Sequence, residues 1–456
     1  MTIKFYNSLT NQKEDFVPIR EGEVGMYVCG MTVYDNCHLG HARAMMAFDI
    51  LARYLRYQGY KLNFTRNITD IDDKIIDRAN ENKETIDALT ERTIASMHED
   101  FLKLGLELPT NEPRATDHIE GMINMISKLI EKGHAYHSEG GDVFFAVRTF
   151  PEYGKLSNKN IDDLNPGSRV EADGSKKDPL DFVLWKSAKQ NEPSWDSPWG
   201  LGRPGWHIEC SVMSLENLGK HFDIHGGGPD LLFPHHENEI AQSECASDHK
   251  FANYWMHSGL LKINGEKMSK SLGNFAMLKD LFASYHPEVI RYYLISSHYR
   301  SSLNFDNESL DQARSALTRL YQAISVAPSQ ESDLHDDSVK EFIHSMNDDL
   351  NTPEALSTLF GLAKLINSSQ DTQDQSMYAS TMRELGKVLG LLNDSSEAFL
   401  QYGAKLTDEE IGKKIDERNQ ARDNKDFQKA DQIRDELAAQ GILLDDSSDG
   451  TSWKKS

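Results

Sequence analysis

The pattern of apolar and polar positions predicts a strand, a long helix and a second strand near the start of the chain. Residues 24–29 form a short apolar run that ends at Gly30, which is typical of a buried strand. Residues 44–55 then place apolar side chains three and four positions apart, as on one face of a helix. Gly59 stands where a helix-ending glycine is expected, and residues 61–69 resemble a strand. Two strands joined by a helix predict the βαβ unit that opens a doubly wound nucleotide-binding sheet.

The pattern changes in the middle of the chain. Residues 81–135 have helical spacing, whereas residues 136–200 contain a strand-like run at 143–147 and several loop signals, which predicts an insertion. After the insertion, the sequence predicts a helix that ends at Leu218, a strand at 222–225, a helix at 234–246 that begins with Pro234, and a hairpin that turns at Asn264 and Gly265.

Beyond residue 275 the pattern is helical almost throughout. A helix is expected at 288–296, and four amphipathic helices predict a bundle at 308–328, 337–346, 352–369 and 374–393. Two charged helices are expected between Asp408 and Ala439, followed by strands at 441–444 and 449–455.

These elements predict an α/β protein. We expect a Rossmann-like, doubly wound parallel sheet with an insertion, followed by an α-helical bundle and a small C-terminal α/β domain. The expected divisions are 1–118 and 201–262 for the two halves of the nucleotide-binding domain, 119–200 for the insertion, 263–307 for a loop and linker region, 308–399 for the bundle and 400–456 for the C-terminal domain.

Composition narrows the class of protein. The chain has 456 residues, 38% of them hydrophobic and 27% charged, and no apolar run long enough to span a membrane. We also find no signal-like leader, and we expect a cytoplasmic protein without membrane contact. The net charge of −23 argues against a protein that coats nucleic acids generally, although it allows a local basic surface. The four cysteines are scattered, which in such a protein favours free thiols or metal ligands over disulfides.

The first motif is His38-Leu39-Gly40-His41, at the start of the first long helix. Free N–H groups and the helix dipole favour anions there, and two histidines three apart can face one phosphate. Gly40 leaves room for a flat group beside the backbone. The alternative is that the two histidines simply cap a surface helix.

The second motif is Lys267-Met268-Ser269-Lys270-Ser271. Two lysines three apart in a loop with serines suit a pyrophosphate leaving group. Together the two motifs resemble the HIGH and KMSKS signatures of class I aminoacyl-tRNA synthetases, with Leu39 in place of isoleucine. We expect His38, His41, Lys267 and Lys270 to be catalytic.

Further ligand contacts are expected at the ends of the predicted strands. Thr69 lies at a strand end, where it could contact substrate, while Asp70 could cap the following helix and Asp73 would add negative charge to its first turn. Gly226 and Gly228 would let the backbone approach a flat ligand, and Asp230 could accept ribose hydroxyls.

A possible metal site combines residues that are far apart in the sequence. Cys29, Cys210, His235, His236 and Glu239 are all expected at the same edge of the sheet, and His235 and Glu239 share a helix face. Two thiolates, an imidazole and a carboxylate are a plausible set of Zn²⁺ ligands. The alternative is that these are ordinary buried thiols and capping histidines, as scattered cysteines and histidines usually are.

The C-terminal helices carry basic residues interspersed with acids, namely Arg418, Arg422, Lys425, Lys429 and Arg434. This pattern fits a solvated helical face. The alternative is an RNA contact, in which Trp453 would stack on a base while Lys454 and Lys455 bind phosphates.

Longer stretches resemble the cysteinyl-tRNA synthetase family over essentially the whole chain. They are YVCGMTVYDNCHLGHAR, RNITDIDDKI, GRPGWHIECS, FDIHGGGPDLLFPHHENEIAQSE, NYWMHSG, GEKMSKSLGN, KDFQKADQIRDEL and DGTSW.

The resemblance implies activation of L-cysteine with Mg²⁺-ATP and transfer to tRNA(Cys) by a monomer, with one Zn²⁺ held by Cys29, Cys210, His235 and Glu239. It also implies that His38, His41 and Lys270 act on the ATP phosphates, and we expect Gly40, Gly226, Gly228 and Asp230 to complete the ATP site. Cysteine would be bound by Thr69 and Trp206, and tRNA by the bundle and the C-terminal domain, including Trp453.

Two other functions share part of this pattern. The cysteine-activating ligase of mycothiol synthesis resembles the same catalytic core but lacks the full C-terminal end, so residues 400–456 argue against it. A synthetase-like protein that only binds tRNA would usually lose its catalytic signatures, and this chain keeps both.

Overall fold

The computed structural model describes residues 2–163, 175–190, 192–267, 275–328, 330, 332–403, 406–447 and 450–455. The predicted loop at 268–274, which includes Lys270, and the side chain of Lys267 lie outside the described residues. The chain forms two compact units. The first contains residues 1–275, 297–305 and 343–352, and the second contains residues 276–296, 306–342 and 353–456.

The centre of the first unit is a parallel sheet in the order β10-β9-β3-β4. Its strands are β3 (Glu23–Val28), β4 (Lys61–Arg66), β9 (Phe222–Gly227) and β10 (Ala252–His257). Helix α1 (Leu39–Tyr57) connects β3 to β4 and ends just before Gly59, whose φ is +87°. The βαβ unit and the α/β fold class expected from the sequence are confirmed.

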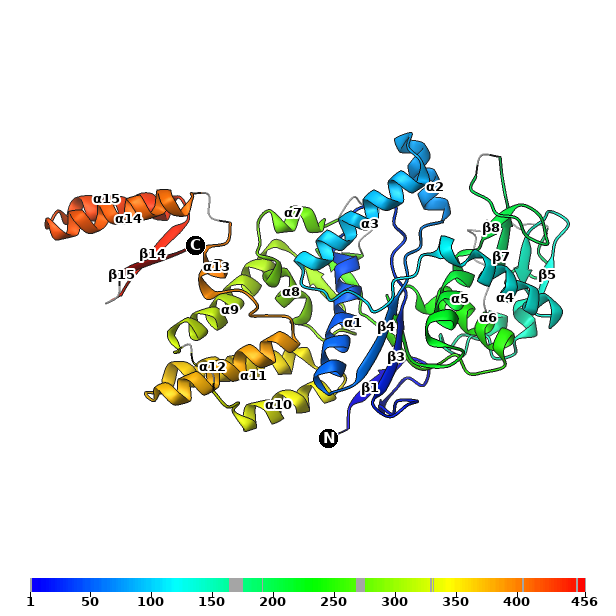
Figure 1. The fold of residues 1–456 in the computed structure, drawn as a ribbon, viewed down its shortest axis with the longest axis horizontal. Coiled ribbons are helices and arrows are strands. Elements are labelled where there is room, and N and C mark those ends of the chain that lie inside the picture. Colours follow the sequence, from blue (N-terminus) through cyan, green and yellow to red (C-terminus); the bar gives the residue numbers. More distant parts are fainter. Residues whose placement is uncertain are drawn as a thin grey trace. The chain divides into compact units, whose positions relative to one another are not determined.

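Helices cover both faces of this sheet. They include α2 (Asp73–Asn82), α3 (Ile86–Lys103), α4 (Ile119–Glu131), α5 (Trp206–Leu218) and α6 (Glu237–Ser247). Figure 1 shows α1 on one side of β3 and β4, with α5 and α6 on the other. Helix α5 has the predicted C-terminal end, whereas α6 begins three residues later than expected. Pro234 lies in a separate helical turn, Leu232–His236, because the backbone at Phe233 is extended.

The inserted segment forms its own antiparallel sheet in the order β5-β6-β7-β8. The strands are β5 (Ala135–His137), β6 (Val143–Phe145), β7 (Phe182–Ser187) and β8 (Gly202–Pro204). Phe145 and Trp185 of this sheet belong to the same buried cluster as Tyr27, Ile208 and Trp255. The insertion therefore shares a hydrophobic core with the parallel sheet.

Two smaller sheets complete the first unit. Strands β1 (Lys4–Asn7) and β2 (Gln12–Asp15) form an antiparallel hairpin. Strands β11 (Leu261–Ile263) and β12 (Glu266–Lys267) form the predicted hairpin, and β13 (Leu303–Phe305) pairs with β11 in parallel. Asn264 and Gly265 have φ values of +51° and +83°, as a two-residue turn with left-handed backbone requires.

The second unit begins with helices and contains the predicted bundle. Its helices before residue 402 are α7 (Leu278–Phe282), α8 (Pro287–Ile295), α9 (Asn307–Val326), α10 (Asp336–Asn347), α11 (Thr352–Ser368), α12 (Thr372–Val388) and α13 (Ser396–Gln401), although the C-terminal end of α10 belongs to the first unit. Helix α12 ends five residues before the predicted boundary, because Gly390 and Leu392 adopt positive φ values of +67° and +61°.

The C-terminal segment contains two helices and a hairpin, as expected. These are α14 (Asp408–Asp423), α15 (Phe427–Ala439), β14 (Ile442–Ser447) and β15 (Gly450–Lys455). A small apolar core joins them through Ile411, Ile415, Ile433, Leu437 and Ile442. Among the described residues of the whole chain, none of the helices has the length and apolar character needed to cross a membrane.

Candidate functional site

The candidate site lies where the strand order of the parallel sheet reverses. The chain runs from β3 through α1 to β4 on one side, whereas β9 lies on the other side of β3. Cys29 follows β3 directly, and its N–H donates to the carbonyl of Gly226 at 3.0 Å. Ligands of doubly wound sheets bind in the crevice at this switch point.

Four predicted metal ligands meet at this point. Cys29 Sγ lies 3.7 Å from Cys210 Sγ, 3.6 Å from His235 Nε2 and 3.4 Å from Glu239 Oε1. His235 Nε2 is 3.1 Å from Glu239 Oε1. The four side chains come from the end of β3, from α5, from the turn before α6 and from α6 itself, and all four are buried. Their donor atoms all lie within 4.8 Å of one another, which is close enough to hold one metal ion.

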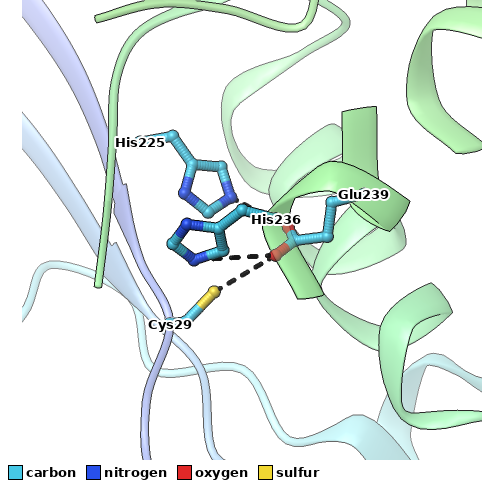
Figure 2. Close-up of side chains that lie close together, drawn as sticks. All are labelled: Cys29, His225, His236 and Glu239. Carbon is cyan, nitrogen blue, oxygen red and sulfur yellow. Dashed lines mark hydrogen bonds and ion pairs between the residues drawn. The ribbon is translucent and has the colours of Figure 1, made fainter. Parts of the chain in front are cut away.

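A second, overlapping set shares Cys29 and Glu239 but uses His225 and His236 (Figure 2). His225 Nε2 lies 2.8 Å from Glu239 Oε2, and His236 Nε2 lies 3.9 Å from Glu239 Oε1. His236 was among the residues expected at this edge of the sheet, whereas His225 was not. His225 lies within a strand that is buried along its whole length, so no alternation of polar and apolar residues distinguishes it.

Two residues of α5 support His235 from the opposite side. His207 Nδ1 lies 2.9 Å from His235 Nδ1, and the ring of Trp206 stacks on His235 with centroids 4.1 Å apart. Trp206 remains 37% exposed. Trp206, expected to contact cysteine, therefore lies directly beside the metal-ligand cluster.

The buried donor groups of the cluster shift one another's pKa values: burial acts against ionisation of His235, yet the neighbouring Glu239 raises the pKa of His235 to about 10. Burial raises the pKa of Cys29 well above its ordinary value. Burial acts in the same direction on Cys210, but hydrogen bonds with Cys29 and His235 outweigh it and lower the pKa of Cys210 to about 6. Burial opposes ionisation of Glu239 too, yet the neighbouring His225 and His235 hold the pKa of Glu239 well below its ordinary value. Zn²⁺ binds thiolates, carboxylates and neutral imidazoles, so metal binding at these four residues would displace the protons that Cys29 and His235 hold.

The two histidines of the first motif lie at the N-terminus of α1. His38 is the N-cap residue, where its Nδ1 accepts from the backbone N–H of His41 at 3.2 Å, and the two rings stack with centroids 3.5 Å apart. Burial lowers the pKa of His38 to about 4, and burial together with His38 holds the pKa of His41 well below its ordinary value. The capping expected as the alternative is present, and the contact of His38, Gly40 and His41 with ATP stays a prediction.

Thr69 belongs to a buried polar chain beside the cluster. Its hydroxyl donates to Glu209 Oε2 at 3.1 Å and lies 3.3 Å from the amide nitrogen of Asn67. Asn67 Oδ1 accepts from the backbone N–H of Gly30 at 2.8 Å. Burial, then the neighbouring Cys210, raises the pKa of Glu209 well above its ordinary value. Glu209 lies between Trp206 and Cys210 in the sequence, but it was not among the residues expected at the site.

The acidic residues after Thr69 differ from expectation. Asp72, rather than Asp70, is the N-cap of α2, and its carboxylate accepts from the N–H of Lys74. Asp70 instead accepts from the backbone N–H and the hydroxyl of Thr116. Asp73 lies in the first turn of α2, as expected.

The strand before the glycine-rich segment was expected to end at His225, but it continues into the glycines. Gly226 and Gly227 are the last residues of β9 itself. A side chain at Gly226 would collide with the ring of Phe48 from α1, so packing alone requires glycine there. Gly228 follows the strand, and Asp230 is exposed nearby. Contact of Gly226, Gly228 and Asp230 with ATP stays a prediction.

The C-terminal residues proposed to bind tRNA are largely engaged within the unit. Arg418 donates to both carboxylate oxygens of Asp446 at 2.9 and 2.7 Å, and Arg422 donates to the same carboxylate at 2.9 Å. Trp453 is half-buried and packs against the small C-terminal core. Its ring is therefore only partly available for stacking on a base.

The matches to known families agree with this geometry. Residues 15–315 match the family described as tRNA synthetases class I (C) catalytic domain, and residues 341–393 match the DALR domain. The chain is 56% identical to the cysteine–tRNA ligase of Methylococcus capsulatus, over 99% of this chain and 100% of that protein. It is 54% identical to the cysteine–tRNA ligase of Escherichia coli, with the same coverage of both chains.

Solved structures show the same fold at low sequence identity. A leucyl-tRNA synthetase from Agrobacterium radiobacter matches 82% of this chain and 84% of its own, with a TM-score of 0.60 and 11% identity. Methionyl-tRNA synthetase from Mycobacterium tuberculosis matches 80% of this chain and 89% of its own, with a TM-score of 0.56 and 15% identity.

Proposed function

The chain belongs to the cysteine–tRNA ligases of class I, and we propose that its buried Cys29, Cys210, His235 and Glu239 hold one Zn²⁺ that selects the cysteine substrate. The observation that carries this proposal is the meeting of the four donor atoms at the switch point of the sheet. Full-length similarity to these ligases favours this function over that of the cysteine-activating ligase of mycothiol synthesis and over tRNA binding without catalysis.

Selection of cysteine over serine is the chemical problem that the metal would solve. A plain pocket rejects such a near-isostere by only about 10². Zn²⁺, when bound, supplies a thiophilic Lewis acid that binds a thiolate far better than a hydroxyl group. Among the four residues that would hold the metal, Glu239 offers a hard carboxylate oxygen, which Zn²⁺ would bind less strongly than it binds a thiolate.

The remaining residues would position the other reactants. The ring nitrogens of His38 and His41, at the N-terminus of α1, would hydrogen-bond the phosphates of Mg²⁺-ATP, and Lys270 would stabilise the departing pyrophosphate. The cysteine carboxylate then attacks the α-phosphorus, pyrophosphate leaves, and cysteinyl adenylate forms. In the second step a terminal ribose hydroxyl of tRNA(Cys) attacks the carbonyl carbon, and AMP leaves. Thr69 and Trp206 border the cluster and would hold the amino acid.

Zinc-edge X-ray absorption on the full chain tests the central proposal. Saturating cysteine should add a sulfur scatterer at about 2.3 Å, whereas serine should leave the spectrum unchanged. Cys210→Ser should lose bound zinc, while Cys245→Ser is the matched control, since Cys245 is also buried but lies outside the cluster. A spectrum that does not change with cysteine would leave the metal with a structural role only.

A further inference from the structure

Glu209 is a buried carboxylate without a counter-charge. It is 1% exposed, and its Oε2 accepts the hydrogen bond from Thr69. Its Oε1 has no hydrogen-bond partner, and among the described residues no lysine, arginine or histidine forms an ion pair with Glu209. Buried carboxylates are almost always paired, because the interior solvates charge poorly. The unpaired oxygen therefore points to a cationic group that the chain itself does not supply.

The position of Glu209 connects it to the proposed cysteine site. Trp206, Glu209 and Cys210 share one face of the first turns of α5, because they are three and four positions apart. Cys210 belongs to the metal-ligand cluster, and Trp206 is partly exposed beside His235. Glu209 thus lies next to the place that the substrate side chain would occupy.

A chain of hydrogen bonds connects Glu209 to the other side of the cluster. It passes through Thr69 and Asn67 to the backbone N–H of Gly30, which follows the ligand Cys29. Glu209 in turn precedes the ligand Cys210. The polar chain therefore adjoins two ligands from different elements, and the hydroxyl of Thr69 is oriented by Glu209.

We propose that Glu209, acting together with the Thr69 that it orients, provides the counter-charge for the ammonium group of the substrate cysteine. This inference rests on the cysteine site proposed above. Only two carbon atoms separate the sulfur of cysteine from its nitrogen, so a thiolate at the cluster places the ammonium group among the residues that adjoin the ligands. Glu209 also offsets the positive end of the α5 dipole, which would otherwise repel an ammonium group.

The alternative is that Glu209 only stabilises the N-terminus of α5, where an acidic residue is generally favourable. The two roles differ in their dependence on the substrate. A helix-stabilising carboxylate affects all ligands of the site equally, whereas a counter-charge affects only those ligands that carry the ammonium group.

The test therefore compares L-cysteine with 3-mercaptopropionate, which lacks the amino group. Titration calorimetry on the zinc-loaded full chain should show that Glu209→Gln weakens cysteine binding roughly 30-fold or more, the scale of a lost buried charge pair. Binding of 3-mercaptopropionate should change by less than about threefold. Glu209→Asp, which keeps the charge, should recover part of the affinity for cysteine. Glu216→Gln on the same helix is the matched control, because Glu216 pairs with His118 at the surface.

Two results would overturn the inference. Equal losses for both ligands in a folded, zinc-loaded Glu209→Gln would reduce Glu209 to a structural role, and unchanged binding of both would exclude it as the counter-charge. If Glu209→Gln does not fold, the same two ligands are compared in Thr69→Val. This variant should also bind cysteine more weakly while its affinity for 3-mercaptopropionate stays near normal. Failure of the zinc proposal would appear separately, as an unchanged zinc-edge spectrum of the unsubstituted protein with cysteine.

Discussion

Removal of the His225 imidazole should weaken zinc binding although His225 is not one of the four proposed ligands. Glu239 Oε1 faces Cys29 and His235, while Oε2 lies 2.8 Å from His225 Nε2. His225 is fully buried and stacks on Trp255 with centroids 4.3 Å apart, so its ring is held in place. With its proton on Nε2, His225 fixes the orientation of the ligand carboxylate, as partners of metal ligands commonly do.

The expected magnitude follows from this single contact. A buried hydrogen bond to a charged group contributes about 1.5–3 kcal/mol, and each 1.4 kcal/mol corresponds to a factor of ten. His225→Phe keeps an aromatic ring beside Trp255 but removes the donor, so the zinc dissociation constant should rise roughly 10- to 100-fold. The measurement is competition with a chelator of known affinity, performed on the folded full chain.

Two further variants make this prediction specific. His225→Gln can place an amide nitrogen near the original Nε2 position, so it should recover part of the zinc affinity. His221→Phe is the control, because His221 contacts Asn253 and lies outside both candidate donor sets. Zinc affinity within threefold of normal in a folded His225→Phe would refute the idea that His225 orients Glu239.

Three other predictions concern different parts of the chain. Deletion of residues 400–456 should leave cysteine-dependent pyrophosphate exchange near normal while charging of tRNA falls, and equal loss of both activities in a folded truncation would contradict separate roles. Lys270→Ala should lower the rate of adenylate formation by about 10²–10³, measured by single-turnover kinetics, since one transition-state donor is lost. Hydrogen bonds from Arg418 and Thr451 hold the pKa of Asp446 below its ordinary value. The stabilisation from Asp446 should therefore be fully present above about pH 5 and decline as the pH falls further. It should be about 1 kcal/mol or less, because the pair is partly exposed. The amides of β14 and β15 should be less protected from hydrogen exchange in Asp446→Asn than in the unsubstituted protein at pH 7, and this difference should disappear in acid.

The elements that the sequence predicted well are those fixed by local patterns. Helix α5 ends at Leu218, as expected. Asn264-Gly265 specifies the hairpin of β11 and β12, because few other residue pairs accept two left-handed positions. The glycines after Phe222 were harder to interpret, because a strand buried on both faces shows no alternation that would mark its end. The core shared by the insertion and the parallel sheet combines residues that are far apart in the sequence, such as Trp185 and Tyr27, and periodicity does not reveal such a combination.

The candidate site shows the same division between local and distant information. Sequence spacing places His235 and Glu239 on one helical face, and the structure shows them 3.1 Å apart. Neither Glu209 nor His225 stands out in the sequence, because their importance comes from an oxygen without a partner and from a contact across the fold. Such residues are recognised only when donors and acceptors can be paired in three dimensions.

The depth of the cluster bears on selectivity as well as on metal affinity. All four proposed ligands are buried, so charges in the cluster interact in a medium of much lower polarity than water. A substrate thiolate would gain from that environment only if it is bonded to a cation, whereas a serine hydroxyl would have to give up water without comparable compensation. Burial therefore widens the difference between the two amino acids. The same reasoning requires a counter-charge for the ammonium group, which is the role that the unpaired oxygen of Glu209 would fill.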